Sequence, residues 1–205
     1  MLKLIALSDT HLNFPDLADL PEADLLVHCG DWTNTGFARG VREMDLAALW
    51  LAQARQKYPT VLALHGNHDI SVRNHHWAAL GAVPLDGHTW FHPAGVSFHG
   101  VALTTAYDMP ELALTWDHMT VNPAAEQYAW DFEPVDVVVA HGPPLGHLDK
   151  MVTGKNVGSS CALEYIERCQ PRLYLCGHIH EAAGEVRLGR TRVVNVAERW
   201  VVLEV

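Results

Sequence analysis

Five short apolar runs follow one another along the chain, and each ends abruptly in polar residues. Apolar runs of four to six residues are typical of buried strands rather than of helices. The residues that follow them are mainly aspartate, asparagine, histidine and glycine, which have no use in an apolar core. The runs occupy residues 2–7, 25–29, 61–64, 135–140 and 172–176.

Helical spacing of apolar residues predicts helices between these strands. The clearest begins near Asn34 or Thr35, includes Val41, and ends before Pro59. Shorter helices are predicted after Ser71, from Pro123, and from Ser159 or Ser160 to Cys169. Residues 83–105 and 185–205 contain short runs broken by glycine and proline, which is typical of hairpins or meanders.

Strands that alternate with helices and then give way to hairpins predict a layered α/β fold. The length of 205 residues suits a single domain spanning residues 1–205. The Trp-rich stretch 106–134 is interpreted as an insertion on the substrate side. In layered α/β proteins, ligands collect at the carboxyl ends of the strands. The five polar clusters are therefore expected to share one site.

Composition narrows the classes of function. A formal net charge of -10 argues against a protein that grips duplex nucleic acid by its phosphates. The four cysteines form no CxxC pair, and Cys29 and Cys176 are expected to be reduced thiols in the core. No signal-peptide pattern and no membrane-spanning run is present in the sequence. We therefore expect no membrane association and a cytoplasmic location; the oligomeric state stays open.

The clusters at the strand ends have the composition of a metal site. Each is weak evidence alone, because a chain with 14 histidines contains such short motifs by chance. Five at the same topological place are not explained by chance. Two carboxylates, one amide and several imidazoles, without a thiolate, suit Mn, Fe or Zn. Seven ligands are too many for one ion and suit two divalent ions, with Asp31 as the natural bridge. The seven are Asp9, His11, Asp31, Asn67, His141, His178 and His180.

As an ordered set, these motifs resemble the calcineurin-like metallophosphoesterase superfamily. The sequence is most similar to its small phosphodiesterase-type members, which include metallophosphoesterase-domain (MPPED-like) proteins and class III cyclic-nucleotide phosphodiesterases. The resemblance implies a four-layer α/β/β/α sandwich with two mixed sheets face to face. It also implies one metal held by Asp9, His11 and His180, a second held by Asn67, His141 and His178, and a bridge through Asp31.

The resemblance further implies roles around the metals. His68 would protonate the leaving oxygen or stabilise the phosphoryl group, and Asp69 would orient His68 by a hydrogen bond, although a turn or cap role for Asp69 is equally favoured. Asn67 and His68 would contact the substrate. Many phosphatases of the superfamily carry an arginine that grips phosphate after Gly-Asp, but here Trp32 follows Asp31. Asn34 either orients a neighbouring histidine or caps the following helix.

The hypothesis is a dinuclear metal-dependent phosphoesterase that hydrolyses a small phosphorylated substrate, such as a nucleotide. Hydroxide shared by the two ions would attack phosphorus in line. The missing arginine puts a protein-phosphatase role in doubt, and the resemblance to phosphodiesterase-type members favours action on diesters over monoesters. The alternatives are a phosphomonoesterase or a nuclease of the same superfamily, and a non-catalytic metal-binding scaffold ranks lower because every ligand is present.

The remaining polar and aromatic residues receive structural interpretations. His28 and His65 are expected to be satisfied polar residues beside strands, and His118 a surface or half-buried residue. Trp116, Tyr107 and Trp130 could stack on a nucleobase, but core packing of the insertion is favoured over that role.

Overall fold

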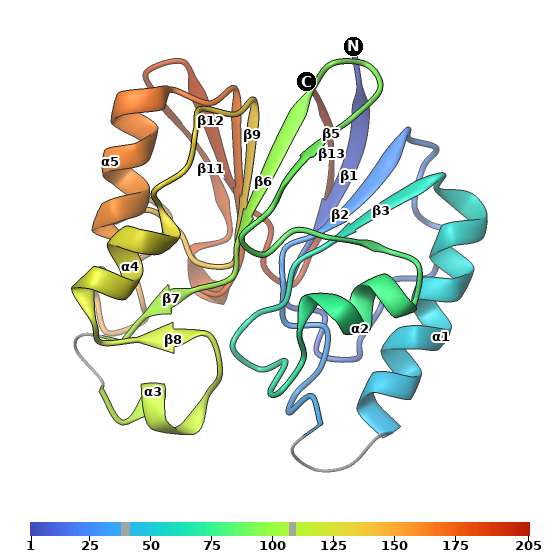
Figure 1. Cartoon of the computed structure of the whole chain (residues 1–205), viewed down its shortest axis with the longest axis horizontal. Helices are drawn as coiled ribbons and strands as arrows, with labels where there is room; N and C mark the ends of the chain where they lie inside the picture. Colours follow the sequence, from blue (N-terminus) through green and yellow to red (C-terminus); the bar gives the residue numbers. More distant parts are fainter. Residues whose placement is uncertain (38–41, 107–109) are drawn as a thin grey trace.

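Two sheets pack face to face in the computed structural model, which describes residues 1–37, 42–106 and 110–205 (Figure 1). The first sheet has the strand order β13-β1-β2-β3-β4 and the second has the order β11-β12-β10-β9-β6-β5. The strands of the first sheet are β1 (Lys3–Leu7), β2 (Leu25–His28), β3 (Thr60–Ala63), β4 (Val83–Pro84) and β13 (Trp200–Glu204). Those of the second are β5 (Thr89–Phe91), β6 (Ser97–Val101), β9 (Val137–Ala140), β10 (Leu173–Cys176), β11 (Gly184–Leu188) and β12 (Thr191–Asn195).

Both faces of the central strands are buried, which explains why their sequences are continuously apolar. In β1, Leu4 and Ala6 enter the core between the two sheets, whereas Ile5 and Leu7 pack on the opposite face. Side chains alternate between the faces of a strand, so one apolar run supplies two separate cores. The parallel strands β2 and β3, which follow β1 in the sheet, continue both layers.

Helices cover the outer face of each sheet, as Figure 1 shows. Helix α1 (Arg42–Lys57) and the short α2 (Asn74–Ala79) cover the first sheet, where Leu51 and Trp77 are fully buried. Helix α4 (Pro123–Ala129) and α5 (Ser160–Cys169) lie over the second sheet, where Tyr165 is buried. The predicted four-layer α/β/β/α sandwich is confirmed.

The insertion between β6 and β9 contains little regular structure ahead of α4. It comprises β7 (Thr104–Thr105), α3 (Leu112–Thr115) and β8 (Met119–Thr120), and β7 and β8 form a two-stranded parallel sheet of their own. The 3-10 helix η1 (His180–Ala182) follows β10 on the other side of the strand ends. The insertion and η1 therefore flank the edge where the polar clusters meet.

The sequence misjudged the start of the first long helix. Residues 34–37 form a bend and a turn rather than helix, and α1 is described from Arg42 to Lys57; the backbone N–H groups of Asn34 and Thr35 donate to the Glu43 carboxylate at 3.0 and 2.8 Å. Asn34 therefore does not cap it, and Val41 lies outside the described residues. Helices starting at Pro123 and capped by Ser159 are confirmed.

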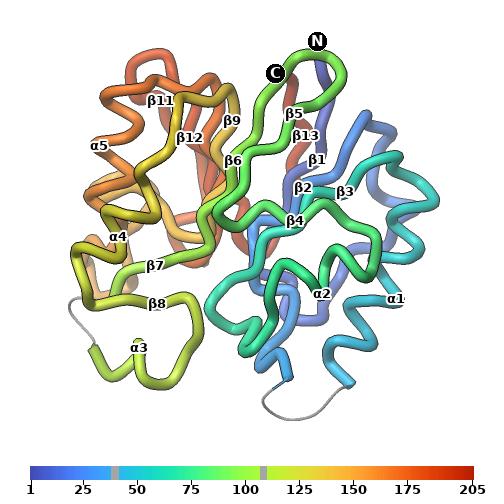
Figure 2. Tube along the Cα trace, in the orientation of Figure 1, coloured from blue at the N-terminus to red at the C-terminus, as the bar shows by residue number. Residues whose placement is uncertain are grey.

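The end of the chain returns to its beginning. Strand β13 pairs antiparallel with β1, and in Figure 2 its red tube lies beside the blue of β1. The turn before β13 consequently reaches the carboxyl end of β1, where the first polar cluster lies.

All four cysteines are free, with Cys29 and Cys176 buried as expected. Among the described residues, no helix combines the length and apolar character needed to cross a bilayer.

Candidate metal centre

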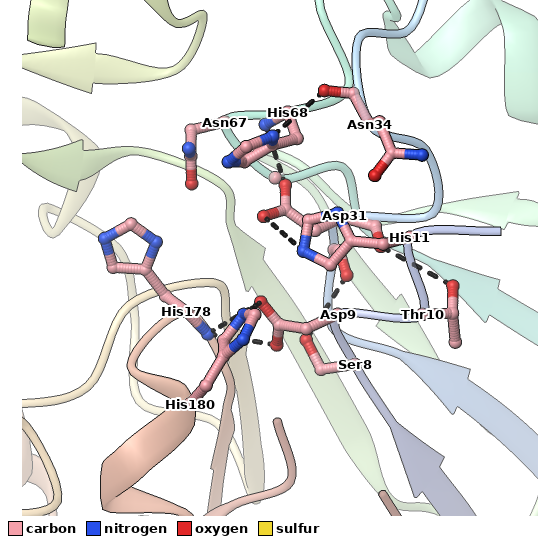
Figure 3. A network of polar contacts seen from close by, with 12 residues as sticks. Ser8, Asp9, Thr10, His11, Asp31, Asn34, Asn67, His68, His178 and His180 are labelled. Carbon is pink, nitrogen blue, oxygen red and sulfur yellow. Dashed lines mark hydrogen bonds and ion pairs between the residues drawn. The ribbon is translucent and has the colours of Figure 1, made fainter. Parts of the chain in front are cut away.

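The carboxyl ends of strands from both sheets meet at one edge of the sandwich, and all seven predicted ligands lie there. The first sheet contributes Asp9 and His11 after β1, Asp31 after β2 and Asn67 after β3. The second contributes His141 after β9, and His178 and His180 after β10. Figure 3 shows His178 and His180 facing Asp9 and Asp31 across the gap between the sheets.

Donor atoms from the two sheets are within a few ångströms of each other. The Nε2 atom of His180 lies 3.2 Å from Asp9 Oδ1. Asp31 Oδ2 lies 3.7 Å from Nε2 of His11 and 3.3 Å from Nε2 of His141. Asp31 therefore lies between ligands of the two predicted ions, which is the position that a bridging carboxylate must have.

The second predicted ligand group is equally close. Asn67 Oδ1 lies 3.0 Å from Nε2 of His141, and the rings of His141 and His178 are 5.0 Å apart between centroids. The other nitrogen of His141, Nδ1, lies 3.0 Å from the carbonyl oxygen of Cys29. Because a carbonyl oxygen only accepts, Nδ1 carries the proton and Nε2 faces the cluster, as metal-binding histidines commonly do.

Two glycines allow this approach. A Cβ atom at Gly66 would collide with the side chains of Asp31 and His141. A Cβ atom at Gly177 would collide with those of Asp9 and Ser8. The glycines in the Gly-Asn-His-Asp and Gly-His-x-His motifs therefore make room for carboxylates that approach the backbone.

Four of the ligand residues have a left-handed backbone. The φ angles are 55° at Asp9, 43° at His11, 56° at Asp31 and 69° at His178. Positive φ is uncommon outside glycine, and aspartate and histidine are among the residues that tolerate it best. Such conformations cluster at functional sites, where the surrounding structure enforces them. Here the turns aim side chains from separate strands at one point.

Charge interactions keep Asp31 ionised and His178 neutral, as a cation requires, whereas His141 must release a proton before it can bind one. Burial opposes the ionised form of Asp31, but His141 outweighs it and lowers the pKa of this carboxyl below its usual range. Burial likewise opposes the charged form of His141, but Asp31 outweighs it and raises the pKa to about 9. The buried pair is thus ionic when no cation is bound. Burial lowers the pKa of His178 to about 4, so this imidazole is neutral at pH 7.

The donor set fits divalent ions. One atom each from Asp9, His11 and His180 lies within 4.8 Å of the others, and the same holds for Asp9, Asp31 and His141. Both carboxylates are 2 % exposed, and buried carboxylates of this kind require a compensating cation or several donors. Oxygen and imidazole donors without thiolate match Mn, Fe or Zn.

The catalytic candidate His68 lies at the solvent side of the cluster. Its Nδ1 atom lies 2.9 Å from the carbonyl oxygen of Asn34. The Trp116 ring packs against it, with centroids 4.0 Å apart. The residue that positions His68 is thus Asn34, through its backbone, which sequence reasoning anticipated only as one of two options.

Asp69 does not orient His68, and this prediction is corrected. Its fully buried carboxylate accepts the backbone N–H groups of Trp32, Thr33 and Gly66 and the Thr33 hydroxyl, at 2.8–3.3 Å. Asp69 therefore ties the turn after β2 to the turn after β3. It supports the ligands Asp31 and Asn67 through the backbone, closer to the alternative turn role.

A cavity of about 340 Å³ adjoins the cluster at Asn67, His68 and His178. Among the described residues that line it there is no lysine or arginine, and Glu181 is the one charged side chain. Half of the sixteen lining residues are apolar: Ala106, Leu112, Trp116, Met119, Leu145, Met151, Val157 and Ile179.

The three aromatic residues considered for stacking on a nucleobase lie in different surroundings. Trp116 is half-buried and faces the cavity, whereas Trp130 is 5 % exposed and packs among Phe132, Tyr165 and Tyr174 as a core residue. Tyr107 lies outside the described residues.

Sequence reasoning missed Glu198, whose carboxylate lies 3.2 Å from Nδ1 of His180. It lies in the turn before β13, and only the return of β13 to β1 places it there.

The sandwich and the facing clusters of aspartate, asparagine and histidine define a protein of the metallophosphoesterase class. Residues 2–182 match the family model of the calcineurin-like phosphoesterases, and the chain belongs to this family. The resemblance inferred from the motifs is confirmed.

Similar proteins agree with this assignment. The chain is 29% identical over 224 residues to the human metallophosphoesterase domain-containing protein 1, covering 95% of this chain and 65% of that protein. It is also 29% identical over 209 residues to the UPF0046 protein K07C11.7 of Caenorhabditis elegans, covering 96% and 70%. The chain thus spans about two thirds of each relative. The solved structure of TT1561 from Thermus thermophilus superposes with a TM-score of 0.60 over 95% of this chain and 88% of its own, at 16% identity. That structure shares the fold.

Proposed function

We propose that the chain is a dinuclear metal-dependent phosphodiesterase for small diesters. The observation that carries the preference for diesters is the cavity beside the metal centre, which has eight apolar lining residues and, among the described residues, no lysine or arginine in its lining. A phosphomonoester presents a dianion, for which proteins commonly supply arginine. A diester presents one negative charge and a second organic group, which needs such a space.

The ligands divide as the family resemblance implies. Asp9, His11 and His180 would hold one ion, Asn67, His141 and His178 the other, and Asp31 would bridge them. When bound, such a pair supplies a water of lowered pKa and neutralises charge on the phosphoryl oxygens. The chain itself fixes the spacing, since the ligands come from two sheets that pack rigidly on a common core.

His68 is the residue proposed to protonate the leaving oxygen. The Asn34 carbonyl fixes a proton on Nδ1, so a second proton on the imidazole resides on Nε2. That proton is the one available to the substrate. Asn67 and His68 both line the cavity, so the leaving group would lie against them and Trp116.

The proposed substrate is small, and a nucleotide is one example. The net charge of -10 disfavours duplex nucleic acid, which binds through cationic residues. The flat Trp116 side chain suits an aromatic or other planar group on the diester.

The test compares hydrolysis of bis-p-nitrophenyl phosphate with that of p-nitrophenyl phosphate, with added Mn²⁺ and with chelator. We expect Mn²⁺-dependent turnover mainly of the diester, and loss of turnover in Asp31→Asn. Preference for the monoester would reject the diesterase proposal. No turnover of either ester by protein shown to contain metal would support a scaffold instead.

A further inference from the structure

A second cluster of metal-binding side chains lies behind the turn that carries Asn67 and His68. His65 follows β3, Asp86 follows β4, and His118 precedes β8 in the insertion. One ligand atom from each lies within 4.8 Å of the other two. None of these three residues belongs to the ligand set described above.

The distances fit a single ion. The Nε2 atom of His65 lies 3.2 Å from Asp86 Oδ2, and the rings of His65 and His118 are 4.1 Å apart between centroids. Zinc bonds to nitrogen and oxygen of about 2.0–2.2 Å place tetrahedral ligands about 3.4 Å apart. The His65–Asp86 pair already has this spacing, and His118, whose ligand atom lies within 4.8 Å of theirs, would move inward on binding.

Two buried polar atoms at this cluster have no hydrogen-bond partner among the described residues. His65 is 1 % exposed, and its Nδ1 atom is buried without a hydrogen-bond partner among the described residues. Nearby, Asn74 donates to the Asp86 carbonyl, while its own Oδ1 atom is also buried without a partner in the described part of the chain. Buried polar atoms without a partner are unfavourable, so the polypeptide alone does not complete the bonding at this place.

Access and charge are compatible with an ion. The Asp86 side chain is 33 % exposed and His118 is half-buried, so the cluster opens to solvent on that side. Arg73 is the opposing charge, with its NH1 atom 3.4 Å from Nε2 of His118. Its guanidinium already pairs with Asp117 at 2.9 Å and is 49 % exposed, so it can turn away while keeping that partner.

We propose that His65, Asp86 and His118 bind a further divalent transition ion of the zinc type, with water completing its coordination. Two imidazoles and one carboxylate with an open position are a common zinc ligand set. This site does not depend on the proposed phosphodiesterase activity.

An ion here would act on the catalytic region through the insertion. His118 is two residues from Trp116, whose ring packs on His68. The ion would fasten the insertion to the ends of β3 and β4, and so hold Trp116 over the cavity. Occupancy of this site would thereby set how firmly the substrate side is ordered.

The experiment measures bound zinc per chain by mass spectrometry of the element, after equilibrium dialysis against buffered Zn²⁺. The wild type should bind three ions and His118→Gln two. Asp9→Asn/Asp31→Asn, which lacks both carboxylates of the main centre, should bind one ion, and adding His118→Gln should remove it. Asp86→Asn keeps an acceptor for the Ala102 N–H group and should behave like His118→Gln. His75→Gln is the control, because this histidine is exposed and outside the cluster; it should leave the zinc content unchanged.

Hydrogen exchange supplies a second readout. In Asp9→Asn/Asp31→Asn, zinc at about 100 times its Kd should slow amide exchange over residues 112–120 by up to about 100-fold, if opening of this segment releases the ion. Zinc that is wholly lost from the folded Asp9→Asn/Asp31→Asn protein, or a zinc content that His118→Gln and Asp86→Asn both leave unchanged, would overturn the proposal. Either result leaves the phosphodiesterase test untouched.

Discussion

The Nδ1 atom of His68 lies 2.9 Å from the Asn34 carbonyl oxygen, which fixes how this imidazole is protonated. His68→Ala should lower kcat by about 10²- to 10⁴-fold if His68 transfers a proton. The loss should be large for a diester with alkyl groups and small for bis-p-nitrophenyl phosphate, because nitrophenolate leaves without protonation. Equal losses on both substrates would instead show that His68 stabilises the phosphoryl group. His75→Ala, at an exposed histidine, is the control.

Asp69 holds two turns together, so its loss should affect stability before chemistry. Asp69→Ala leaves the buried donors of Trp32, Thr33 and Gly66 without their acceptor. Each such donor costs about 1–3 kcal/mol, and we expect unfolding in urea to become easier by about 3 kcal/mol or more. Asp69→Asn keeps one acceptor oxygen and should lose clearly less. Equal stability of the wild type and Asp69→Ala would contradict this role.

Glu198 contacts the predicted metal ligand His180 from outside the cluster. Its carboxylate lies 3.2 Å from Nδ1 of His180, whose Nε2 faces Asp9. Loss of such an outer partner typically lowers metal affinity by about 10- to 100-fold. Because Glu198 is exposed, we expect a loss of about tenfold. Competition with a chelating dye would measure the change in Glu198→Gln. Glu204→Gln, at an exposed position of β13, should leave affinity unchanged.

The ion pair of Asp31 and His141 predicts that the metal-free protein loses stability at alkaline pH. The pKa of folded His141 is raised to about 9, above the usual value of 6.5. A raised pKa stabilises the fold fully below about pH 6.5, and this contribution disappears as pH rises to about 9. The Tm of metal-free protein should therefore fall over this range.

Metal-loaded protein should lack this fall, because a bound cation replaces the proton of His141. Asp31→Asn should flatten the slope in the metal-free state as well, since it removes the charge that raises the pKa. A Tm of the metal-free wild type that stays constant from about pH 6.5 to about pH 9 would refute the ion pair.

Replacement of Trp116 tests whether the insertion contributes to binding of the organic group of the diester. Trp116→Ala should raise KM for aryl diesters by about tenfold or more, because one stacked aromatic contact is worth about 1–3 kcal/mol. Metal content should not change, since Trp116 is not among the predicted ligands and its ring packs on His68. An unchanged KM would show that the organic group lies elsewhere.

The strand ends were predictable because each apolar run and its polar stop are local in sequence. The sheet to which β4 belongs was not predictable, because its two residues are too few to show which strand they pair with. The contact of Glu198 with His180 depends on the return of β13, and that of His65 with His118 joins positions 53 apart along the chain. The start of helix α1 was misplaced because Asn34 and Thr35, which are common cap residues, lie instead in a bend whose backbone N–H groups donate to the Glu43 carboxylate.

The left-handed backbone at Asp9, His11, Asp31 and His178 has a consequence for how this site should be dissected. Alanine at these positions would remove a donor and also disfavour the local chain path, so a loss of function would mix two causes. Asparagine in place of aspartate tolerates the same path, and glycine relaxes it. Comparing the asparagine, glycine and alanine replacements at one position would separate the contribution of the ligand from that of the loop shape that presents it.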